Sequence, residues 1–169
     1  MSILDRLLGA QPDPTKDWPI EPPPPAAFDL THRAFGSLIF GGSLESAKSL
    51  GRPDRFEWTQ PDYCELLYAR SGFQIDFSHG SFGYLAFFLG PDALLPRHPD
   101  MTFSQPELGE GIRLTDDTSR AQLDACFGLP DAEDTDENET ILFYTRNGIA
   151  VEFEYARNGL LKRCNLYPK

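Results

Sequence analysis

The stretch YARSGFQIDF at residues 68–77 is followed later in the chain by a near copy, YTRNGIAVEF, at residues 144–153. The first copy places apolar side chains at alternate positions, Phe73, Ile75 and Phe77, and the second copy does the same. A period of two is typical of a β-strand with one buried face. The repetition indicates that the chain is built twice from one structural unit.

A helix is expected before the strands of each copy. The segment FGSLIFGGSLESAKSLGRPD (35–54) matches EGIRLTDDTSRAQLDACFGLPD (110–131) in the order of its features. Each has a polar cap (Ser43 in the first, Thr118 or Ser119 in the second), then an apolar face at helical spacing, then Gly and Pro. Glycine supplies the left-handed C-cap of a helix, and the following proline prevents its continuation.

Short turn signals separate the expected strands: RSG at 70–72, and RNG at 146–148 and again at 157–159. Asn-Gly favours a two-residue hairpin, because both central residues of a type I′ turn need a positive φ. The predicted fold is therefore α+β, two tandem repeats of a helix followed by an antiparallel β-meander. Whether the two sheets join edge to edge is left open by the pattern.

The predicted organisation has four segments. Residues 1–34 hold a short amphipathic helix and a proline-rich linker, 35–90 the first repeat, 91–109 an irregular connector, and 110–169 the second repeat. Residues 11–27 contain seven prolines, which favours an extended conformation. This first segment either packs back on the domain or forms a tether for docking.

Charge and cysteine content limit the classes of function. The net charge is −11, with 26 acidic and 15 basic residues, so nucleic acid and anionic membranes are disfavoured. Such a charge would attract a basic protein partner, although acidity more often serves only to keep a protein soluble. Three unpatterned cysteines suit a reducing compartment. The start, MSILDRLLGA, lacks the features of a signal peptide, and no apolar run reaches membrane-spanning length. A cytoplasmic location is expected.

Candidate binding residues lie opposite the expected helices. In strand 73–78 apolar and polar residues alternate, so Asp76, and Glu152 in the second copy, are expected on an open, solvated face. The strand GYLAFFL is apolar on both faces, so Tyr84 and Phe88 either lie under the proline-rich tail, as we expect, or form an exposed aromatic patch.

The acidic stretch DAEDTDENE at 131–139 fits a solvated loop or, as the second reading, a docking patch for a basic partner. It lacks the pattern of a calcium-binding loop. The matching region of the first copy carries an aromatic residue instead. The candidate partner-binding residues are Trp58, Asp76, Tyr84, Phe88, Asp134, Asp136, Glu137, Glu152 and Glu154.

No catalytic or cofactor site is predicted. Asp76 and Glu152 as a general acid and base are disfavoured, because duplication produces matched acids without any catalytic role. A triad of Cys64, His79 and Asp76 is disfavoured because the odd spacing of His79 and Asp76 sends them to opposite faces of a strand. No histidine or cysteine pair has the spacing of metal ligands.

The motif G-x-P at the end of each expected helix, in SLGRPD and CFGLPD, followed by a meander with a Gly-centred hairpin, resembles the unit of the β-lactamase inhibitor protein (BLIP) family. It is also similar to the BamE-like (SmpA/OmlA) lipoproteins. The resemblance covers residues 35–167. It implies two copies whose sheets form one curved surface that grips an enzyme, and hence a binding surface and no active site.

These observations lead to two hypotheses. The first is a non-enzymatic cytoplasmic protein-binding module, such as an immunity or inhibitor protein that binds a basic toxin or enzyme through its open sheet face. The second is an adaptor or assembly subunit that docks through its N-terminal helix and proline-rich tether.

Overall fold

The structure, a computed structural model, describes residues 11–20, 26–109 and 111–169. The helix predicted within residues 1–10 and the proline run at 21–25 lie outside the described residues. Strands hold 43% of the described residues and helices only 12%, so the protein is mostly β. None of the helices in the described ranges is long and apolar enough to cross a membrane.

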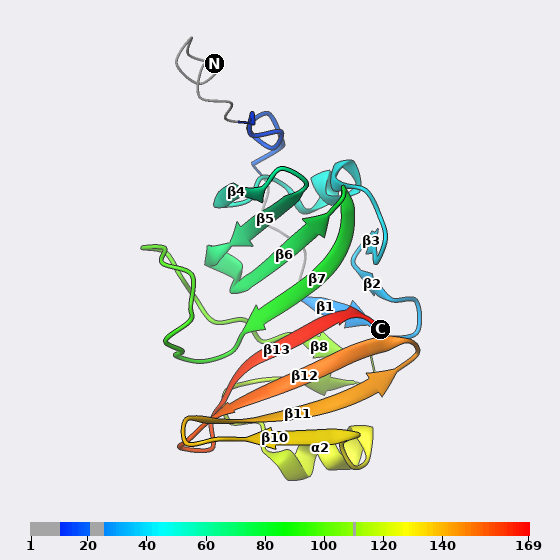
Figure 1. Cartoon of the computed structure of the whole chain (residues 1–169), viewed down its shortest axis with the longest axis vertical. Coiled ribbons are helices and arrows are strands. Elements are labelled where there is room, and N and C mark those ends of the chain that lie inside the picture. Colours follow the sequence, from blue (N-terminus) through cyan, green and yellow to red (C-terminus); the bar gives the residue numbers. More distant parts are fainter. Residues whose placement is uncertain (1–10, 21–25, 110) are drawn as a thin grey trace.

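An eight-stranded antiparallel sheet forms the body of the molecule, in the order β10-β11-β12-β13-β7-β6-β5-β4 (Figure 1). Its β13 pairs with β7, from Arg163 opposite Phe88 to Leu166 opposite Leu85, and this pairing joins two four-stranded meanders into one sheet. The strands are β4 (Arg55–Gln60), β5 (Tyr63–Tyr68), β6 (Phe73–Ser78), β7 (Ser81–Phe88), β10 (Ala132–Thr135), β11 (Glu139–Arg146), β12 (Ile149–Ala156) and β13 (Leu161–Pro168).

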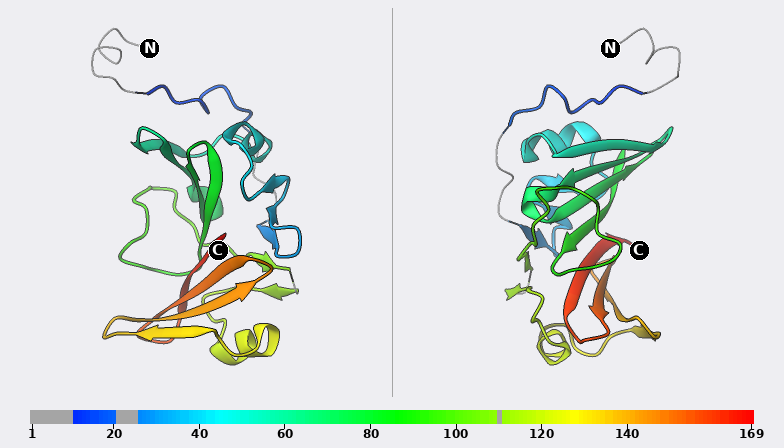
Figure 2. Two further views of the ribbon diagram at one scale, coloured as in Figure 1. Left: turned by 45° about the vertical axis from the view of Figure 1, so that its right-hand side comes forward. Right: turned by 90° about the vertical axis from the view of Figure 1, so that its left-hand side faces the viewer.

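A second, smaller sheet has the order β3-β2-β1-β8-β9, with β1 and β8 parallel. It lies behind the large sheet in Figure 1 and to one side of it in Figure 2. None of these strands was predicted. They are β1 (Ala27–Asp29), β2 (Ala34–Phe35), β3 (Leu38–Ile39), β8 (Glu107–Leu108) and β9 (Ile112–Arg113).

The helices are shorter than predicted. Residues Leu44–Leu50 form a 3₁₀ helix, η1, and Ser43 makes no side-chain capping bond there. Apolar residues three apart fit a 3₁₀ helix, which has three residues per turn. The α-helix α2 (Arg120–Phe127) has eight residues and a capping box from Ser119. The predicted α+β class, built of two helix-then-meander repeats, is therefore wrong: short helices cover a large sheet.

One hydrophobic core fills the space between the two sheets, η1 and α2. Phe73, Ile75 and Phe77 are buried there, as their alternation predicted. The corresponding residues of β12, together with Leu50 of η1 and Phe127 of α2, belong to the same core. Both halves of the large sheet thus share one core and have the same face covered.

The Asn-Gly pairs in the sequence predict one of the two hairpin turns correctly. Asn147 and Gly148 both have positive φ, at 50° and 74°, which confirms the predicted two-residue hairpin between β11 and β12. His79 and Gly80, at 51° and 75°, form the same kind of turn between β6 and β7. At 157–159 only Gly159 has a positive φ, so this turn is of another type.

Part of the predicted linker packs against the domain. Trp18 is buried in the core, at 6% exposure. The indole N–H of Trp58 donates to the carbonyl of Pro12 at 3.1 Å, and the backbone N–H of Arg52 donates to Pro19 at 2.7 Å. Residues 11–20 therefore lie beside β4, the outer strand of the sheet, and cover part of it.

Candidate functional site

One face of the eight-stranded sheet, which we call the open face, lies opposite the small sheet and the helices. It faces the reader in Figure 1, and Figure 2 shows the small sheet and residues 91–106 on opposite sides of the large one. Asp76 and Glu152 lie on this face, because they alternate with core residues of β6 and β12. The structure thus places both carboxylates on the predicted face, but the expectation that Asp76 is solvated was wrong, because Asp76 is buried.

Three carboxylates form a row across β4, β5 and β6. Glu57 is directly opposite Glu65, and Glu65 is directly opposite Asp76. Like charges in such positions repel one another. Burial raises the pKa of Glu65, the charges of Asp76 and Glu57 raise it further, and Arg55 opposes them. This row therefore concentrates carboxylates that repel one another on one part of the open face.

Asp76 is the buried member of the row, at 5% exposure. The hydroxyl of Tyr63 donates to one carboxylate oxygen at 2.5 Å, and the amide of Gln74 donates to the other at 2.9 Å. Burial raises the pKa of Asp76 more than these two hydrogen bonds lower it.

Two tyrosines occupy the middle of the open face. The rings of Tyr84 and Tyr167 stack with centroids 6.4 Å apart, across the junction of β7 and β13. The hydroxyl of Tyr84 donates to Asn165 at 2.9 Å, and Tyr167 donates to Glu152. Burial and this bond to Glu152 raise the pKa of Tyr167 to about 12, so it remains a neutral donor at physiological pH. Hydrogen bonds thus hold both rings in place.

A network of ion pairs closes one end of the face. A β-bulge at Glu154 leaves Lys162 as an extra residue of β13, so Lys162 and Arg163 reach the same carboxylates. Asp92 lies 2.5 Å from Arg163 and 3.6 Å from Lys162, and Lys162 also pairs with Glu139 and Glu154.

Some carboxylates on the open face form ion pairs with basic side chains, and others do not. The carboxylates around Lys162 have cationic partners. Within the described ranges no ion pair involves Glu65, Asp76 or Glu152, and their neighbours are tyrosines and amides. The unmatched negative charge lies on either side of the tyrosine pair.

The predicted binding residues fall into different environments. Tyr84 and Glu152 are half-buried on the open face, and Asp76, directly opposite Tyr84 on β6, is buried. Trp58 packs towards the core beneath Pro12, and Glu154, at 8% exposure, is held by Asn165 and the ion-pair network. Trp58 and Glu154 therefore make most of their contacts within the protein, which makes them weaker candidates for binding a partner.

The prediction that the proline-rich tail covers Tyr84 and Phe88 was wrong: Tyr84 is half-buried on the open face, and both residues pack with the connector. Phe88 is buried under the connector, where Leu95 and Met101 pack against it. Residues 11–20 lie beside β4, and residues 27–29 and 34–35 belong to the small sheet. The connector is tied down by backbone bonds from Thr102 to Ala69 and from Ser104 to Phe88.

The acidic stretch is not the solvated loop that we expected. Residues 132–135 form β10, the outer strand of the sheet next to β11, and Asp134 lies opposite Ile141. Asp136 accepts the backbone N–H groups of Asn138 and Glu139, which lowers its pKa. Asp134, Asp136 and Glu137 are all exposed.

The sequence reading missed the residues that hold the site together. Tyr63 and Glu65 alternate with the core residues of β5, a signal that was available. Asp92, Asn165 and Tyr167 carry no comparable local signal, because their partners come from distant segments.

The structure does not bring Cys64 and His79 together with Asp76. Cys64 lies in the core, on the other face from Asp76, and burial raises its pKa to about 12. His79 lies 2.5 Å from Asp62 in an exposed turn. No group of three His, Cys, Asp or Glu residues in the described part of the chain is placed to hold a metal ion.

Comparison with known proteins bears on the fold alone. No protein-family profile and no curated protein matches the sequence. The structure is similar to the crystal structure of YjgB, a DUF4309 family protein from Bacillus subtilis subsp. subtilis str. 168, with a TM-score of 0.52 and 12% identity. The match covers 80% of this chain and 84% of that one. It bears on neither the BLIP family nor the BamE-like proteins, so that resemblance stays a hypothesis.

Proposed function

We propose that the protein is a non-enzymatic binding module that holds a basic protein partner on its open face. The observation that carries the proposal is the arrangement of unmatched carboxylates, Glu65 and Asp76 on one side and Glu152 on the other, around the stacked Tyr84 and Tyr167. A net charge of −11 adds a long-range attraction for a basic surface.

Three physical reasons favour tight binding at this face. Tyrosines give a large contact area at a small cost in conformational entropy and are enriched at protein interfaces. Tyr84 and Tyr167 are held by hydrogen bonds before any partner arrives, so little ordering is needed on binding. Carboxylates that lack cations gain more from a partner's arginine or lysine than carboxylates already paired.

An inhibitor or immunity role is the form of this function that we favour. A basic toxin or enzyme would be masked by contact with the acidic face, as the resemblance to the BLIP family suggests. A cytoplasmic location is part of the proposal. It is supported by three free cysteines, Cys64, Cys126 and Cys164, which suit a reducing compartment.

The adaptor hypothesis has less support. Residues 11–20 pack on the domain through Trp18 and the contacts with Trp58 and Arg52, so this part of the chain does not serve as a free spacer. No observation on the described residues favours docking through the N-terminal segment.

The test compares two double variants of the full chain with the same change in net charge. Glu65→Gln with Glu152→Gln removes open-face charge, whereas Glu45→Gln with Glu107→Gln removes exposed charge from η1 and the small sheet. Each protein is immobilised and exposed to lysate of the native host at low salt, and a retained protein is identified and its Kd measured.

We expect one basic protein that wild type and the control pair retain. The open-face pair should bind it about tenfold more weakly, and salt should release it. Retention of the same partner by the open-face pair with unchanged Kd would contradict the proposal. Failure of wild type to retain any basic protein would also contradict it.

A further inference from the structure

The outer edge of β10 is a second surface suited to binding. β10 pairs with β11 on one side, and on its other side no strand of the described chain is hydrogen-bonded to it. Its four residues are all exposed. A free edge carries backbone N–H and C=O groups ready to pair with an added strand. The opposite edge of the sheet, β4, is partly covered by residues 11–20.

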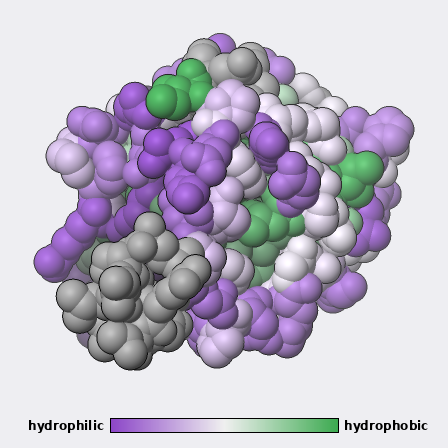
Figure 3. Space-filling model, turned by 90° about the horizontal axis from the view of Figure 1, so that it is seen from above, coloured by the Kyte–Doolittle hydropathy of each residue, from purple (hydrophilic) through white to green (hydrophobic). Residues whose placement is uncertain are grey.

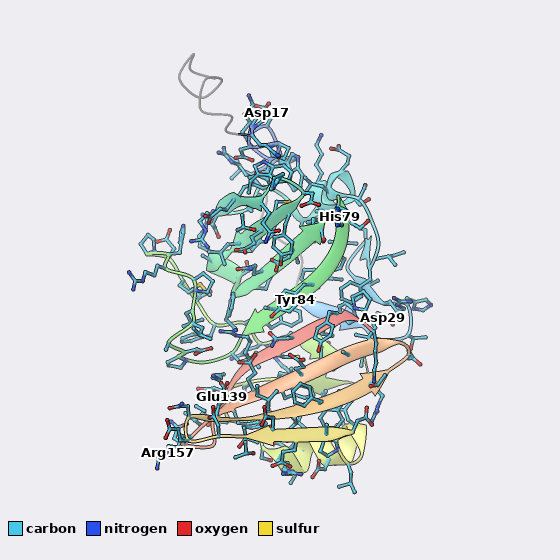
Figure 4. The ribbon with its side chains drawn as sticks, viewed as in Figure 1. Asp17, Asp29, His79, Tyr84, Glu139 and Arg157 are labelled. Carbon is cyan, nitrogen blue, oxygen red and sulfur yellow. The ribbon has the colours of Figure 1, made fainter. Side chains whose placement is uncertain are left out.

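A groove of about 450 Å³ lies beside this edge, between the start of α2 and the core side of β10, β11 and β12. Figure 4 shows Glu139 and Arg157 at this end of the sheet. Leu142, Tyr155 and Ala156 contribute apolar lining. Glu133 lies directly opposite Leu142, so its side chain is on the groove side of β10.

The charges around the groove favour a cation at the β10 edge. Arg120 is engaged by Glu133 at 2.8 Å, and Glu139 pairs with Lys162. Arg157 lines the end of the groove formed by the turn after β12. Asp136 lines the groove on the β10 side and has no ion pair among the described residues.

Carboxylates also continue along the strand beyond the groove. Asp134 lies on the other face of β10, and Glu137 lies in the turn that follows. Both are exposed, and neither has an ion pair within the described part of the chain. An added strand would therefore meet uncompensated negative charge on both of its faces.

We propose that β10 accepts a ninth strand, an extended lysine- or arginine-bearing segment of a partner protein, with one basic side chain in the groove beside it. The aliphatic stem of that side chain lies on Leu142 and Tyr155, and its cation lies near Asp136. A second copy of this chain does not fit, because pairing two β10 edges would set acids opposite acids. This surface is separate from the tyrosine pair of the open face.

The probe is the short synthetic peptide acetyl-TKVKTKVKT-amide, and its control has glutamate in place of each lysine. Both are titrated at low salt into isotope-labelled full-length protein and followed by amide NMR. The lysine peptide should shift resonances of residues 132–142, 119–120 and 155–159 saturably and slow the exchange of β10 amides. The glutamate peptide should do neither.

Two double variants with equal changes in charge test the site. Asp134→Lys with Glu137→Lys should weaken binding of the lysine peptide about tenfold, because two attractions become repulsions. Glu45→Lys with Glu107→Lys, on exposed acids of η1 and the small sheet, should leave the Kd within about twofold of wild type. Circular dichroism checks that both variants fold.

The proposal is overturned by any of four results. Shifts centred on Glu65, Asp76 and Glu152 would assign the peptide to the open face. Equal weakening by both double variants would show that only net charge matters. Self-association in place of peptide binding would make a second copy the occupant. Absence of saturable binding would remove the site altogether.

Discussion

Lys162 places an ammonium group among three carboxylates while only 8% of the residue is exposed. Although burial lowers its pKa, the hydrogen bond to Glu139 and the charges of Asp92 and Glu154 raise the pKa above its usual value. Lys162→Met keeps most of the volume but leaves the carboxylates facing one another, with Arg163 alone to compensate. We expect the free energy of unfolding to fall by about 3 kcal/mol, measured by urea denaturation at neutral pH.

The matched control for Lys162 is Lys48→Met. The Lys48 side chain is half exposed and lies 3.6 Å from Glu45 within one turn of η1. An exposed pair of this kind contributes little, so the free energy of unfolding should change by less than about 0.5 kcal/mol. Equal effects of the two substitutions would show that the Lys162 network is no stronger than a surface pair.

Asp76 should make stability depend on pH in an unusual direction. Burial raises its pKa above the ordinary value of 3.8, although hydrogen bonds from Tyr63 and Gln74 oppose the shift. Between pH 3.8 and the raised pKa the folded protein keeps a proton that the unfolded chain has released. The contribution of Asp76 to the free energy of unfolding therefore falls as pH rises through this window, and Asp76→Asn removes that fall.

Asp136→Asn is the control with the opposite sign. Hydrogen bonds from the backbone of Asn138 and Glu139 lower the pKa of Asp136, so its stabilising contribution is present above the unfolded pKa and is lost as pH falls through the lowered pKa. Urea denaturation in steps across the acidic range measures both variants against wild type. Curves for Asp76→Asn and wild type that stay parallel would contradict the prediction.

At the scale of elements, Gly72 allows the connector to lie close to the β5–β6 hairpin. Its φ is +70°, and a Cβ there would meet the backbone N of Ser104 at 2.4 Å and the carbonyl O of Thr102 at 2.8 Å. Gly72→Ala must displace the connector and expose Phe88 beneath it. We expect a loss of about 3 kcal/mol in the free energy of unfolding and faster amide exchange at Thr102 and Ser104.

Gly148→Ala separates the steric effect from backbone strain. Gly148 has a similar φ of +74°, but nothing lies within 4 Å of the added Cβ. The strain of the left-handed conformation alone should cost about 1 kcal/mol. If the two alanine variants lose equal stability, the close approach of the connector to Gly72 does not contribute to the loss in Gly72→Ala.

Elements with a local pattern were predicted well from the sequence. The alternation of Phe73, Ile75 and Phe77 places β6 correctly, because only one of its faces meets the core. Asn147–Gly148 identifies its hairpin because few other residue pairs adopt two positive φ angles. The helices were overestimated, since the spacing of Leu44, Ala47 and Leu50 does not separate a 3₁₀ turn from an α-helix.

Elements without a local pattern were missed. The strands of the small sheet have two or three residues, too few for any period to show. β10 carries acids because it is an exposed edge that has no need of apolar residues. The site was found in part: the face of Asp76 and Glu152 follows from alternation, whereas the pairing of Tyr84 with Asn165 requires knowing that β7 and β13 are neighbours.

At the scale of the molecule, the two meanders form one sheet over one core, and this should make them unfold together. Only four residue pairs, from Arg163–Phe88 to Leu166–Leu85, join β13 to β7. The core is nevertheless continuous, with residues of both halves in one buried cluster. A cluster shared in this way couples the halves more strongly than the strand pairing alone.

We therefore expect a single cooperative transition in urea. Both tryptophans, Trp18 and Trp58, report on the first half, whereas circular dichroism reports on the strands of both halves. The two curves should coincide for wild type, and Leu166→Ala at the junction should shift both to lower urea by the same amount, losing about 3 kcal/mol. If the tryptophan signal of Leu166→Ala keeps its wild-type midpoint while circular dichroism shifts, the halves are separate folding units. The open face would then be two surfaces that happen to meet, and a partner bound across Tyr84 and Tyr167 would have to hold them together.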